Sequence, residues 1–440
     1  MGCPGGDAGR EAARPNVVLI VVDTLRADFL GAYGFEAGTS PRLDALAERS
    51  LVFDRAVAAS SLTAPSHASI MTSRFVREHS IGYLNGGTRL VGGPTLASVF
   101  RDAGYDTAAF ISNSIIQSRV GLDAGFDVYD DALPDSERNR PYIFERTADA
   151  TTARAVEWLA REATAPFFLW VHYQDPHGPY TPPEDLAARF DHPPRPGEKP
   201  LPRLDRQSGH RGIPAYQALP GLEYASQYRA RYAAEIRYFD QGLARLLDAV
   251  DGREGEGGTV LLLTADHGES MGEGHYFFAH GHATTPDLAR VPFLLAAPDL
   301  EPGRSAALVH HVDVMPTLLD LAGLEPPSGL RGLALGRLAR EKAAFPDRLV
   351  YTDVGNDVAA YGRDGFVRIT ERGREADATT EGWRAFRWHD SGRWSPAPID
   401  EGRRDEIRAY LETRTPTEEA APLDPDDIER LRALGYVEPD

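Results

Sequence analysis

The 440-residue sequence contains one cysteine, Cys3, and no long uncharged apolar run. A single cysteine provides no intrachain disulfide framework, and the body of the chain has no thiol nucleophile. The longest apolar run, Val17 to Val22, has the length of a strand and is far shorter than the roughly 18 residues that a membrane-spanning helix needs. The hydrophobic content of 42% predicts a globular chain with room for one large and one smaller domain.

The sequence also has no excess of positive charge: its formal net charge is −19. This balance argues against nucleic acid, and against an anionic membrane surface, as the main partner. It does not exclude an anionic ester substrate, because a bound divalent cation and a few nearby arginines or histidines can reverse the local field. The composition leaves the oligomeric state open.

The first residues, Met1-Gly2-Cys3 and the prolines and glycines that follow, lack the apolar segment of a signal peptide. Gly6 stands where N-myristoylation requires Ser or Thr. Two interpretations remain for residues 1–14. They form a flexible lead, which is compatible with the cytoplasm, or they begin a mature bacterial lipoprotein with a lipid anchor at Cys3, which predicts an extracytoplasmic location.

Apolar, β-branched runs alternate with helical patterns over roughly 300 residues, which predicts an α/β layered domain with a mostly parallel sheet. The predicted strands are Asn16–Val22, Thr107–Ile111, Phe167–His172, Val260–Ala265 and Phe293–Ala296. The predicted helices are Pro41–Ser50, Thr95–Ala103, Ala148–Arg161 and Arg229–Val250.

Two later regions depart from this alternation. Residues 191–221 are rich in proline and predict a long surface loop, either a lid or a disordered segment. After Pro326-Pro327 the pattern changes to short strands, so we expect a catalytic α/β domain at 15–327 and a small antiparallel α+β subdomain at 328–415. Residues 416–440 are expected to form a tail with a short helix, Asp426–Leu434. The short strands are predicted at Arg348–Thr352, Ala359–Tyr361, Gly365–Thr370 and Phe386–His389.

Acidic side chains directly follow two of the predicted strands. Asp23 comes after the first strand, and Asp266-His267 follow the strand that ends at Ala265. Ligands of open α/β sheets bind at the carboxyl ends of the strands, so we expect these side chains to converge there. Each acid taken alone also fits a helix cap or a turn. Together with the turn Thr63-Ala64-Pro65, they favour a functional site over capping.

Asp23, Asp266, His267 and Thr63 form the ligand set that we expect for one divalent cation. Mixed nitrogen and oxygen ligation favours Zn²⁺ or Mn²⁺, with Ca²⁺ and Mg²⁺ as alternatives. A cation there would lower the pKa of the Thr63 hydroxyl and neutralise charge that develops on an ester. The pattern therefore predicts Thr63 as a nucleophile.

The stretch from Thr63 to Arg74 resembles the nucleophile loop and helix of the sulfatases, and Pro65, Ser66 and Thr72 are in register with that pattern. Other segments resemble sulfatase patterns in the same order along the chain. They are residues 40–47, 95–107, 172–180, 264–269, 312–319 and 431–437. The resemblance implies the sulfatase branch of the alkaline phosphatase superfamily, with its alkaline-phosphatase-like α/β/α sandwich and small C-terminal domain.

The departures from the sulfatase pattern concern the nucleophile first. Sulfatases oxidise a Cys or Ser to formylglycine, whereas this chain has Thr63, whose secondary alcohol would give a ketone; no formylglycine is expected. His67 stands at the family's Arg position and Ser73 at its Gly position. Asp23-Thr24 replaces the usual pair of acids and resembles the single-metal site of phosphoethanolamine and phosphoglycerol transferases. A second metal, as in nucleotide pyrophosphatases, is the alternative; Asp175, His177 and His282 are its candidate ligands, and one ion is favoured.

The resemblance also implies roles for several cationic side chains. His177 is expected to contact the ester oxyanion, and His280 and His282 are expected to protonate the leaving group, a task that suits imidazole. Arg74 either binds the substrate anion or forms a surface ion pair, and His67 orients the loop beside the substrate.

These observations predict a metal-dependent hydrolase or transferase of phosphate or sulfate esters that uses Thr63, with phosphoesters preferred. The alternatives are a sulfuric ester hydrolase without formylglycine and a catalytically inactive, sulfatase-like binding module. Retention of Asp23, Thr63, Asp266 and His267 together argues against the binding module. Fold class alone does not identify the alcohol portion of the substrate.

Overall fold

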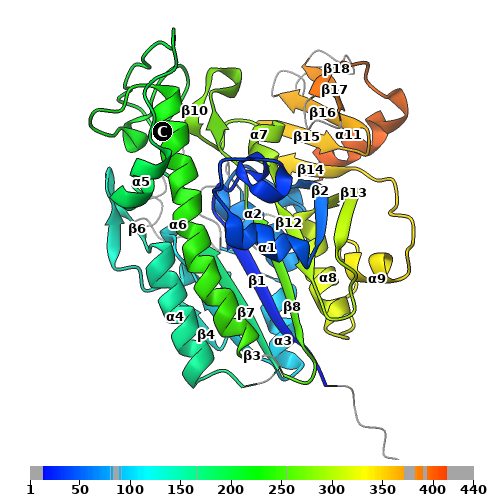
Figure 1. The fold of residues 1–440 in the computed structure, drawn as a ribbon. Coiled ribbons are helices and arrows are strands. Elements are labelled where there is room, and N and C mark those ends of the chain that lie inside the picture. Colours follow the sequence, from blue (N-terminus) through cyan, green and yellow to red (C-terminus); the bar gives the residue numbers. More distant parts are fainter. Residues whose placement is uncertain are drawn as a thin grey trace, which may run out of the picture.

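The computed structural model describes residues 13–79, 81–82, 89–90, 92–164, 166–253, 255–370, 382–389 and 394–413. A 9-stranded sheet forms the centre of the part described (Figure 1). Strand β1 (Asn16–Val22) pairs in parallel with β7 (Phe167–Tyr173) on one side and β8 (Thr259–Ala265) on the other. All seven residues of β1 are buried, which explains its uninterrupted apolar sequence.

The direction of the outer strands decides which chain segments meet at one edge of the sheet. β3 (Asp106–Phe110) runs parallel to β7. β12 (Phe293–Ala296) is antiparallel to both β8 and β2 (Leu51–Val57), so β2 and β8 point the same way. The carboxyl ends of β1, β2, β3, β7 and β8 therefore share an edge. The remaining strands of the sheet are β4 (Val128–Asp130), β11 (Arg290–Val291) and β13 (Gly303–His310).

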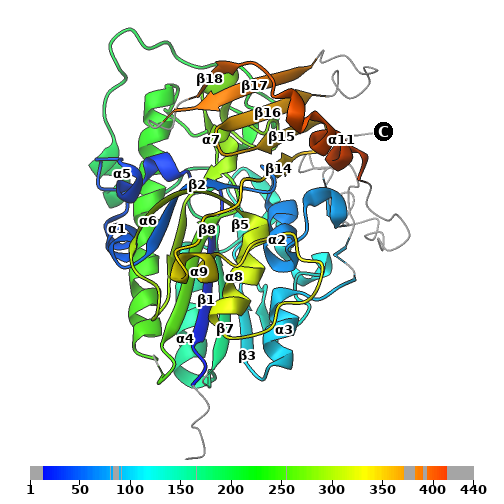
Figure 2. The same ribbon diagram turned by 90° about the vertical axis from the view of Figure 1, so that its right-hand side faces the viewer.

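Helices cover both faces of the large sheet, as Figure 2 shows, so the predicted α/β/α sandwich is confirmed. One layer contains α1 (Pro41–Glu48), α4 (Ala148–Arg161), α5 (Glu184–Phe190) and α6 (Ala225–Asp251). The other contains α2 (Thr63–Thr72), α3 (Leu96–Asp102), α8 (Val314–Leu321) and α9 (Leu335–Arg340).

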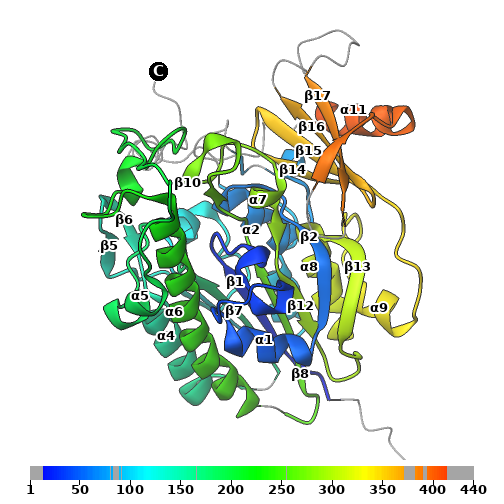
Figure 3. The same cartoon turned by 45° about the horizontal axis from the view of Figure 1, so that its top comes forward.

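A second, antiparallel sheet follows in the chain and lies beside the top of the first (Figure 3). Its strands are β14 (Val350–Asp353), β15 (Asp357–Tyr361), β16 (Gly365–Thr370), β17 (Trp383–Trp388) and β18 (Trp394–Ala397), with α11 (Arg404–Glu412) packed against them. Asp353 N donates to Ala59 O at 2.9 Å, and Ser60 Oγ donates to Asp353 O at 2.8 Å. The small sheet thereby supports the loop that leads to Thr63.

The smaller elements are two strand pairs and one short helix. They are β5 (Asp135–Glu137) with β6 (Arg140–Glu145), β9 (Ser270–Met271) with β10 (Phe277–Ala279), and α7 (Pro286–Ala289). The proline-rich loop at 191–221 contains one short 3-10 turn, Ala215–Gln217. Cys3, the helix predicted at Asp426–Leu434 and the match at 431–437 lie outside the described residues. Within those residues, no helix has the length and apolar character needed to cross a membrane.

Candidate active site

Three segments bring the predicted metal ligands together at the carboxyl edge of the sheet. Asp23 follows β1, Asp266 and His267 follow β8, and Thr63 begins α2 after β2. Thr63 Oγ1 lies 3.4 Å from His267 Nε2, and all four side chains are buried. The parallel direction of β1, β2 and β8 explains this convergence, since each segment leaves the sheet at the same edge.

The two carboxylates each keep one oxygen without a hydrogen-bond partner. Asp266 Oδ1 accepts from the backbone N–H groups of Thr24 (3.1 Å) and His267 (2.7 Å), and Asp23 Oδ2 accepts from Asn113 Nδ2 (3.1 Å). Within the described part of the chain, Asp266 Oδ2 and Asp23 Oδ1 have no such partner; they lie 3.5 and 3.9 Å from His267 Nε2. Buried, unpaired carboxylate oxygens are costly unless a cation binds them, so these residues fit a divalent metal.

The electrostatics of the cluster support the same ligand set. Burial raises the pKa of Asp266 to about 8, and burial with the neighbouring Asp266 carboxylate raises the pKa of Asp23 well above its usual value. Burial and the nearby His280 lower the pKa of His267 to about 4, so this imidazole is neutral. His267 Nδ1 donates to Gly268 O at 2.9 Å, which leaves the lone pair on Nε2 facing the carboxylates. A cation would relieve the repulsion between the two carboxylates.

His67 and His172 lie against Asp266 and resemble a second set of metal ligands. His67 Nδ1 donates to Thr63 O at 2.9 Å, so its Nε2 carries a lone pair. His172 Nδ1 accepts from Ser112 N at 3.4 Å, which favours the tautomer with the proton on Nε2; this nitrogen lies 3.8 Å from Asp23 Oδ2 and has no hydrogen-bond partner among the described residues. A protonated nitrogen cannot bind a metal, and this tautomer argues against a second ion at His172.

A row of histidines leads outward from His267. The His267 and His280 ring centroids are 4.6 Å apart, and those of His280 and His177 are 5.2 Å apart. His177 Nδ1 lies 3.0 Å from the Gln174 amide nitrogen, a donor, so His177 Nε2–H remains a donor. This row places hydrogen-bonding groups next to His267, whose Nε2 lies 3.4 Å from the Thr63 hydroxyl.

The comparison with known proteins agrees with this arrangement. The family model described as "Sulfatase" matches residues 15–324. The chain belongs to the sulfatase family. It is an ester hydrolase of the alkaline phosphatase superfamily, and its family is generally metal-dependent.

Curated relatives of this sulfatase-family chain are similar over most of their lengths. An arylsulfatase of Clostridium perfringens is 27% identical, covering 82% of this chain and 87% of its own. A choline-sulfatase of Rhizobium meliloti is 29% identical, covering 71% and 68%. The solved phosphonate monoester hydrolase from Silicibacter pomeroyi has a TM-score of 0.66 and 20% identity, covering 93% of this chain and 99% of its own. The alkaline-phosphatase-like fold predicted from sequence is confirmed.

The structure places Arg74 at the far end of α2 from Thr63, and its binding of the substrate anion stays a prediction. Thr63 is the first residue of α2 and Arg74 follows the end of that helix, about 15 Å away at the rise of an α-helix. Arg74 Nη2 donates to Gly92 O at 3.1 Å near the surface. Between them, Ser73 adopts the left-handed conformation (φ 53°) that explains why the family pattern has glycine there.

The two histidines predicted to protonate the leaving group lie in different surroundings. The His280 ring contacts both His267 and His177. The His282 ring stacks on Tyr276 with 3.6 Å between centroids, and its Nε2 lies 3.4 Å from Ser270 Oγ. His280 therefore lies in the row that begins at His267, whereas His282 packs against Tyr276; that both protonate the leaving group stays a prediction.

Sequence reasoning missed several side chains that hold the site together. Asn113, the residue after Ser112 at the exit of β3, donates to Asp23. His311 accepts from Ala59 N (3.1 Å) and donates to Ala265 O (2.9 Å), linking the ends of β2 and β8. The signal for Asn113 is its position after a buried strand, the same signal that identified Asp23.

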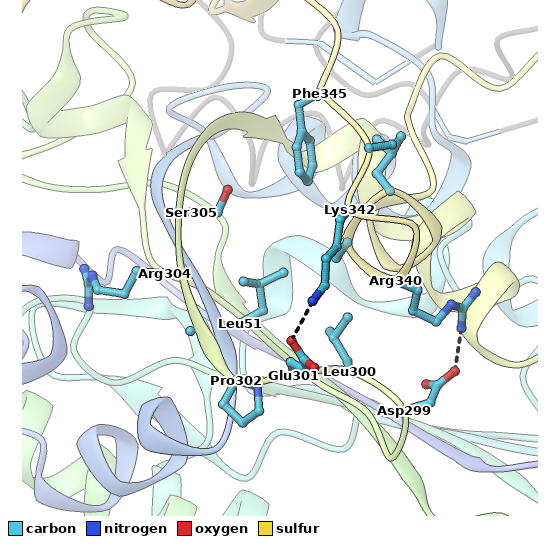
Figure 4. A pocket seen from close by; sticks show the side chains of 14 residues that line it. Leu51, Asp299, Leu300, Glu301, Pro302, Arg304, Ser305, Arg340, Lys342 and Phe345 are labelled. Carbon is cyan, nitrogen blue, oxygen red and sulfur yellow. Dashed lines mark hydrogen bonds and ion pairs between the residues drawn. The ribbon is translucent and has the colours of Figure 1, made fainter.

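A cavity of about 520 Å³ lies elsewhere, between the turn after β12 and the end of α9. Figure 4 shows two ion pairs among its side chains, Lys342 with Glu301 and Arg340 with Asp299. The remaining charged side chain, Arg304, pairs with Asp54 outside the pocket. None of the candidate catalytic residues lines it, so we do not assign the ester chemistry to this cavity.

Replacing Asn113 by alanine is expected to weaken metal affinity about 10- to 100-fold, because the amide fixes the orientation of the Asp23 carboxylate. Competition with a calibrated chelator measures the affinity. Asn16→Ala is the matched control, since Asn16 is also buried but begins β1 at the opposite end of the strand. Equal affinities for parent and Asn113→Ala would remove Asn113 from the metal site.

Proposed function

We propose that this chain is a metal-dependent hydrolase of phosphate or phosphonate esters in which the Thr63 hydroxyl is the nucleophile. The observation that carries the proposal is the position of Thr63 Oγ1, 3.4 Å from His267 Nε2 at the edge of a cluster with two unpaired carboxylate oxygens. The Thr63 hydroxyl also lies close enough to Asp266 to lower the pKa of that carboxyl. A buried hydroxyl among three ligand groups fits a nucleophile better than a helix cap.

Asp23, Asp266, His267 and Thr63 would hold one divalent ion, with Zn²⁺ or Mn²⁺ favoured by the mixed donor set. When bound, such an ion lowers the pKa of a coordinated hydroxyl and offsets anionic charge. The chain itself holds Thr63 in place: its carbonyl accepts from His67, and its N-terminal position on α2 directs the positive end of the helix dipole toward an anionic ester.

His280 and His177 supply hydrogen bonds on the side of the leaving group. In this proposal His280 acts in its doubly protonated form, which donates Nδ1–H to Glu269 and its Nε2 proton to the departing oxygen; burial lowers the pKa of this ring to about 3, and the charge of the bound ester would have to raise it. His177 Nε2–H binds a non-bridging oxygen of the ester. Both rings keep a little exposure, whereas Asp23, His267 and Asp266 have none, so an ester approaches from the histidine side. Water or an acceptor alcohol then clears the esterified threonine.

Turnover of a phosphoester or phosphonate ester is expected to exceed that of the matched sulfate ester by at least about tenfold in kcat/KM. A hydrated formylglycine has two hydroxyl groups, and the second one expels the sulfate after the first has attacked. Threonine has only one hydroxyl, so a sulfated Thr63 would be cleared slowly. Assays on aryl phosphate, diester, phosphonate and sulfate substrates with one common phenol measure the difference directly.

The same assays with Thr63→Ala exclude a contaminating esterase.

The names of the curated relatives favour a competing function, a sulfuric ester hydrolase that works without formylglycine. Sustained multiple turnover of the aryl sulfate, with all phosphorus esters untouched, would establish that function in place of the one proposed.

A further inference from the structure

Glu269 is a fully buried carboxylate that neither the metal ligands nor the nucleophile uses. It follows Gly268 in the turn after β8, and both of its oxygens are engaged. Glu269 Oε1 lies 3.1 Å from His280 Nδ1, and Glu269 Oε2 accepts from the Tyr180 hydroxyl at 3.0 Å. The carboxylate therefore links His280 to Tyr180, a residue that follows β7 in the chain.

The backbone around Glu269 fixes the position of this carboxylate. A Cβ at Gly268 would lie 2.1 Å from Asp287 O, so only glycine allows the close approach that turns the chain there. Arg26 Nη1 donates to Glu269 O at 2.9 Å, and Tyr180 packs against Tyr232 with 5.4 Å between ring centroids. A side chain held this firmly can define the orientation of its partner.

The contact with His280 is the one that bears on chemistry. Because Nδ1–H is donated to Glu269, the ring can present only Nε2 to the space beside His177, and Nε2 carries a transferable proton only in the imidazolium form, which the Glu269 carboxylate stabilises. A catalytic imidazole whose second nitrogen is held by a buried carboxylate is the arrangement that enzymes use to fix tautomer and ring angle. Without that contact the His280 ring would rotate about its side-chain bonds.

We propose that Glu269, supported by Tyr180, is a positioning residue that holds His280 with Nε2 toward the leaving group of the ester. This inference rests on the proposed function for the identity of the reaction. The role predicts a difference between two kinds of ester. Cleavage of an ester whose alcohol is a poor leaving group depends on His280, whereas an acidic phenol departs without a proton from His280. Glu269 thus determines how well the enzyme cleaves esters of ordinary alcohols.

The test measures kcat/KM of Glu269→Gln on a series of aryl and alkyl esters whose leaving groups differ in pKa. Glutamine has the same shape but one acceptor oxygen, so it cannot accept from both Tyr180 and His280. We expect a loss of about 10- to 100-fold on the poorest leaving group and less than about threefold on the best, because general acid catalysis matters only where the alcohol needs a proton. Tyr180→Phe should change the series in the same direction by a smaller factor.

A double-mutant cycle separates positioning from a structural role. Once His280 is replaced by alanine, adding Glu269→Gln should cost nothing further on poor leaving groups. Glu235→Gln is the matched control, because Glu235 is also a buried glutamate but packs with Asp175, and it should leave the dependence on leaving group unchanged. Metal content should equal that of the parent in every variant.

A Glu269→Gln variant whose kcat/KM falls by the same factor on every ester would overturn the inference. So would a loss that adds to the loss in His280→Ala, or one that is accompanied by loss of metal.

The side-chain ¹⁵N spectrum of His280 gives a readout that needs no turnover. The Nδ1 signal should lose its carboxylate hydrogen bond in Glu269→Gln, and an unchanged signal would contradict positioning. A parent that cleaves no ester, with this shift present, would refute the proposed function and leave the Glu269–His280 contact intact.

Discussion

Thr63→Ala is expected to lower turnover of every cleaved ester by at least about 10³-fold, because the alanine removes the atom that attacks the ester. Thr63 Oγ1 lies 3.4 Å from His267 Nε2, and its side chain is buried. The substitution leaves the fold intact, since α2 also depends on Ser66 and His67, which hydrogen-bond to the preceding loop and to Thr63 O. Steady-state kinetics with metal-saturated protein measure the loss.

Thr63→Ser is the conservative control for that experiment. Serine keeps a hydroxyl at the same carbon, so we expect measurable turnover, and thermal unfolding should show both variants folded. Equal rates for Thr63→Ala and the parent would remove this residue from the mechanism. Unmodified threonine in the intact peptide is expected as well, because no aldehyde is needed.

Asp266→Ala is expected to lose nearly all of the bound metal. Asp266 contributes the unpaired Oδ2, and its Oδ1 holds the backbone of Thr24 and His267. Its removal takes away a carboxylate ligand and frees the backbone that positions a second ligand, His267. Elemental analysis after dialysis against a stated concentration of Zn²⁺ or Mn²⁺ gives the stoichiometry, which should be one ion per parent chain.

Asp240→Asn provides the matched control for metal loss. Asp240 is buried like Asp266, but it accepts from the N–H groups of Arg42 and Leu43 at the start of α1. This variant should keep its metal even if its unfolding temperature falls. Full metal occupancy in Asp266→Ala would contradict the ligand assignment, and two ions in the parent would contradict the tautomer argument at His172.

The sequence predicted the parts of the fold whose signals are local. β1 and β8 are buried on both faces, so their apolar runs were evident, and their positions located Asp23 and Asp266. β2 was not predicted, because Asp54 and Arg55 interrupt its apolar pattern where it is only half-buried. β13 was missed for the same reason, since most of its residues stay partly exposed along the sheet.

In the candidate site, too, only the residues with a local sequence signal could be predicted. Residues that follow strands were found, but contacts between distant segments carry no sequence signal: Asn113 with Asp23, and Tyr180 with Glu269, are 90 and 89 residues apart. Arg74 lies near Thr63 in the chain yet at the other end of α2, so proximity in the sequence does not bring the two residues together. His282 and His280 are two residues apart, and Gly281, with its left-handed φ of 76°, separates their directions.

Thr63 is expected to become covalently attached to the phosphoryl or phosphonyl group during turnover. Rapid acid quench of the metal-loaded enzyme with an aryl phosphate, followed by mass spectrometry of the peptide that contains Thr63, detects this attachment. We predict one added phosphoryl group on Thr63 during turnover and none in Thr63→Ala. Turnover at full rate with no adduct on Thr63 at any quench time, or with the adduct on another residue, would show that Thr63 is not the nucleophile.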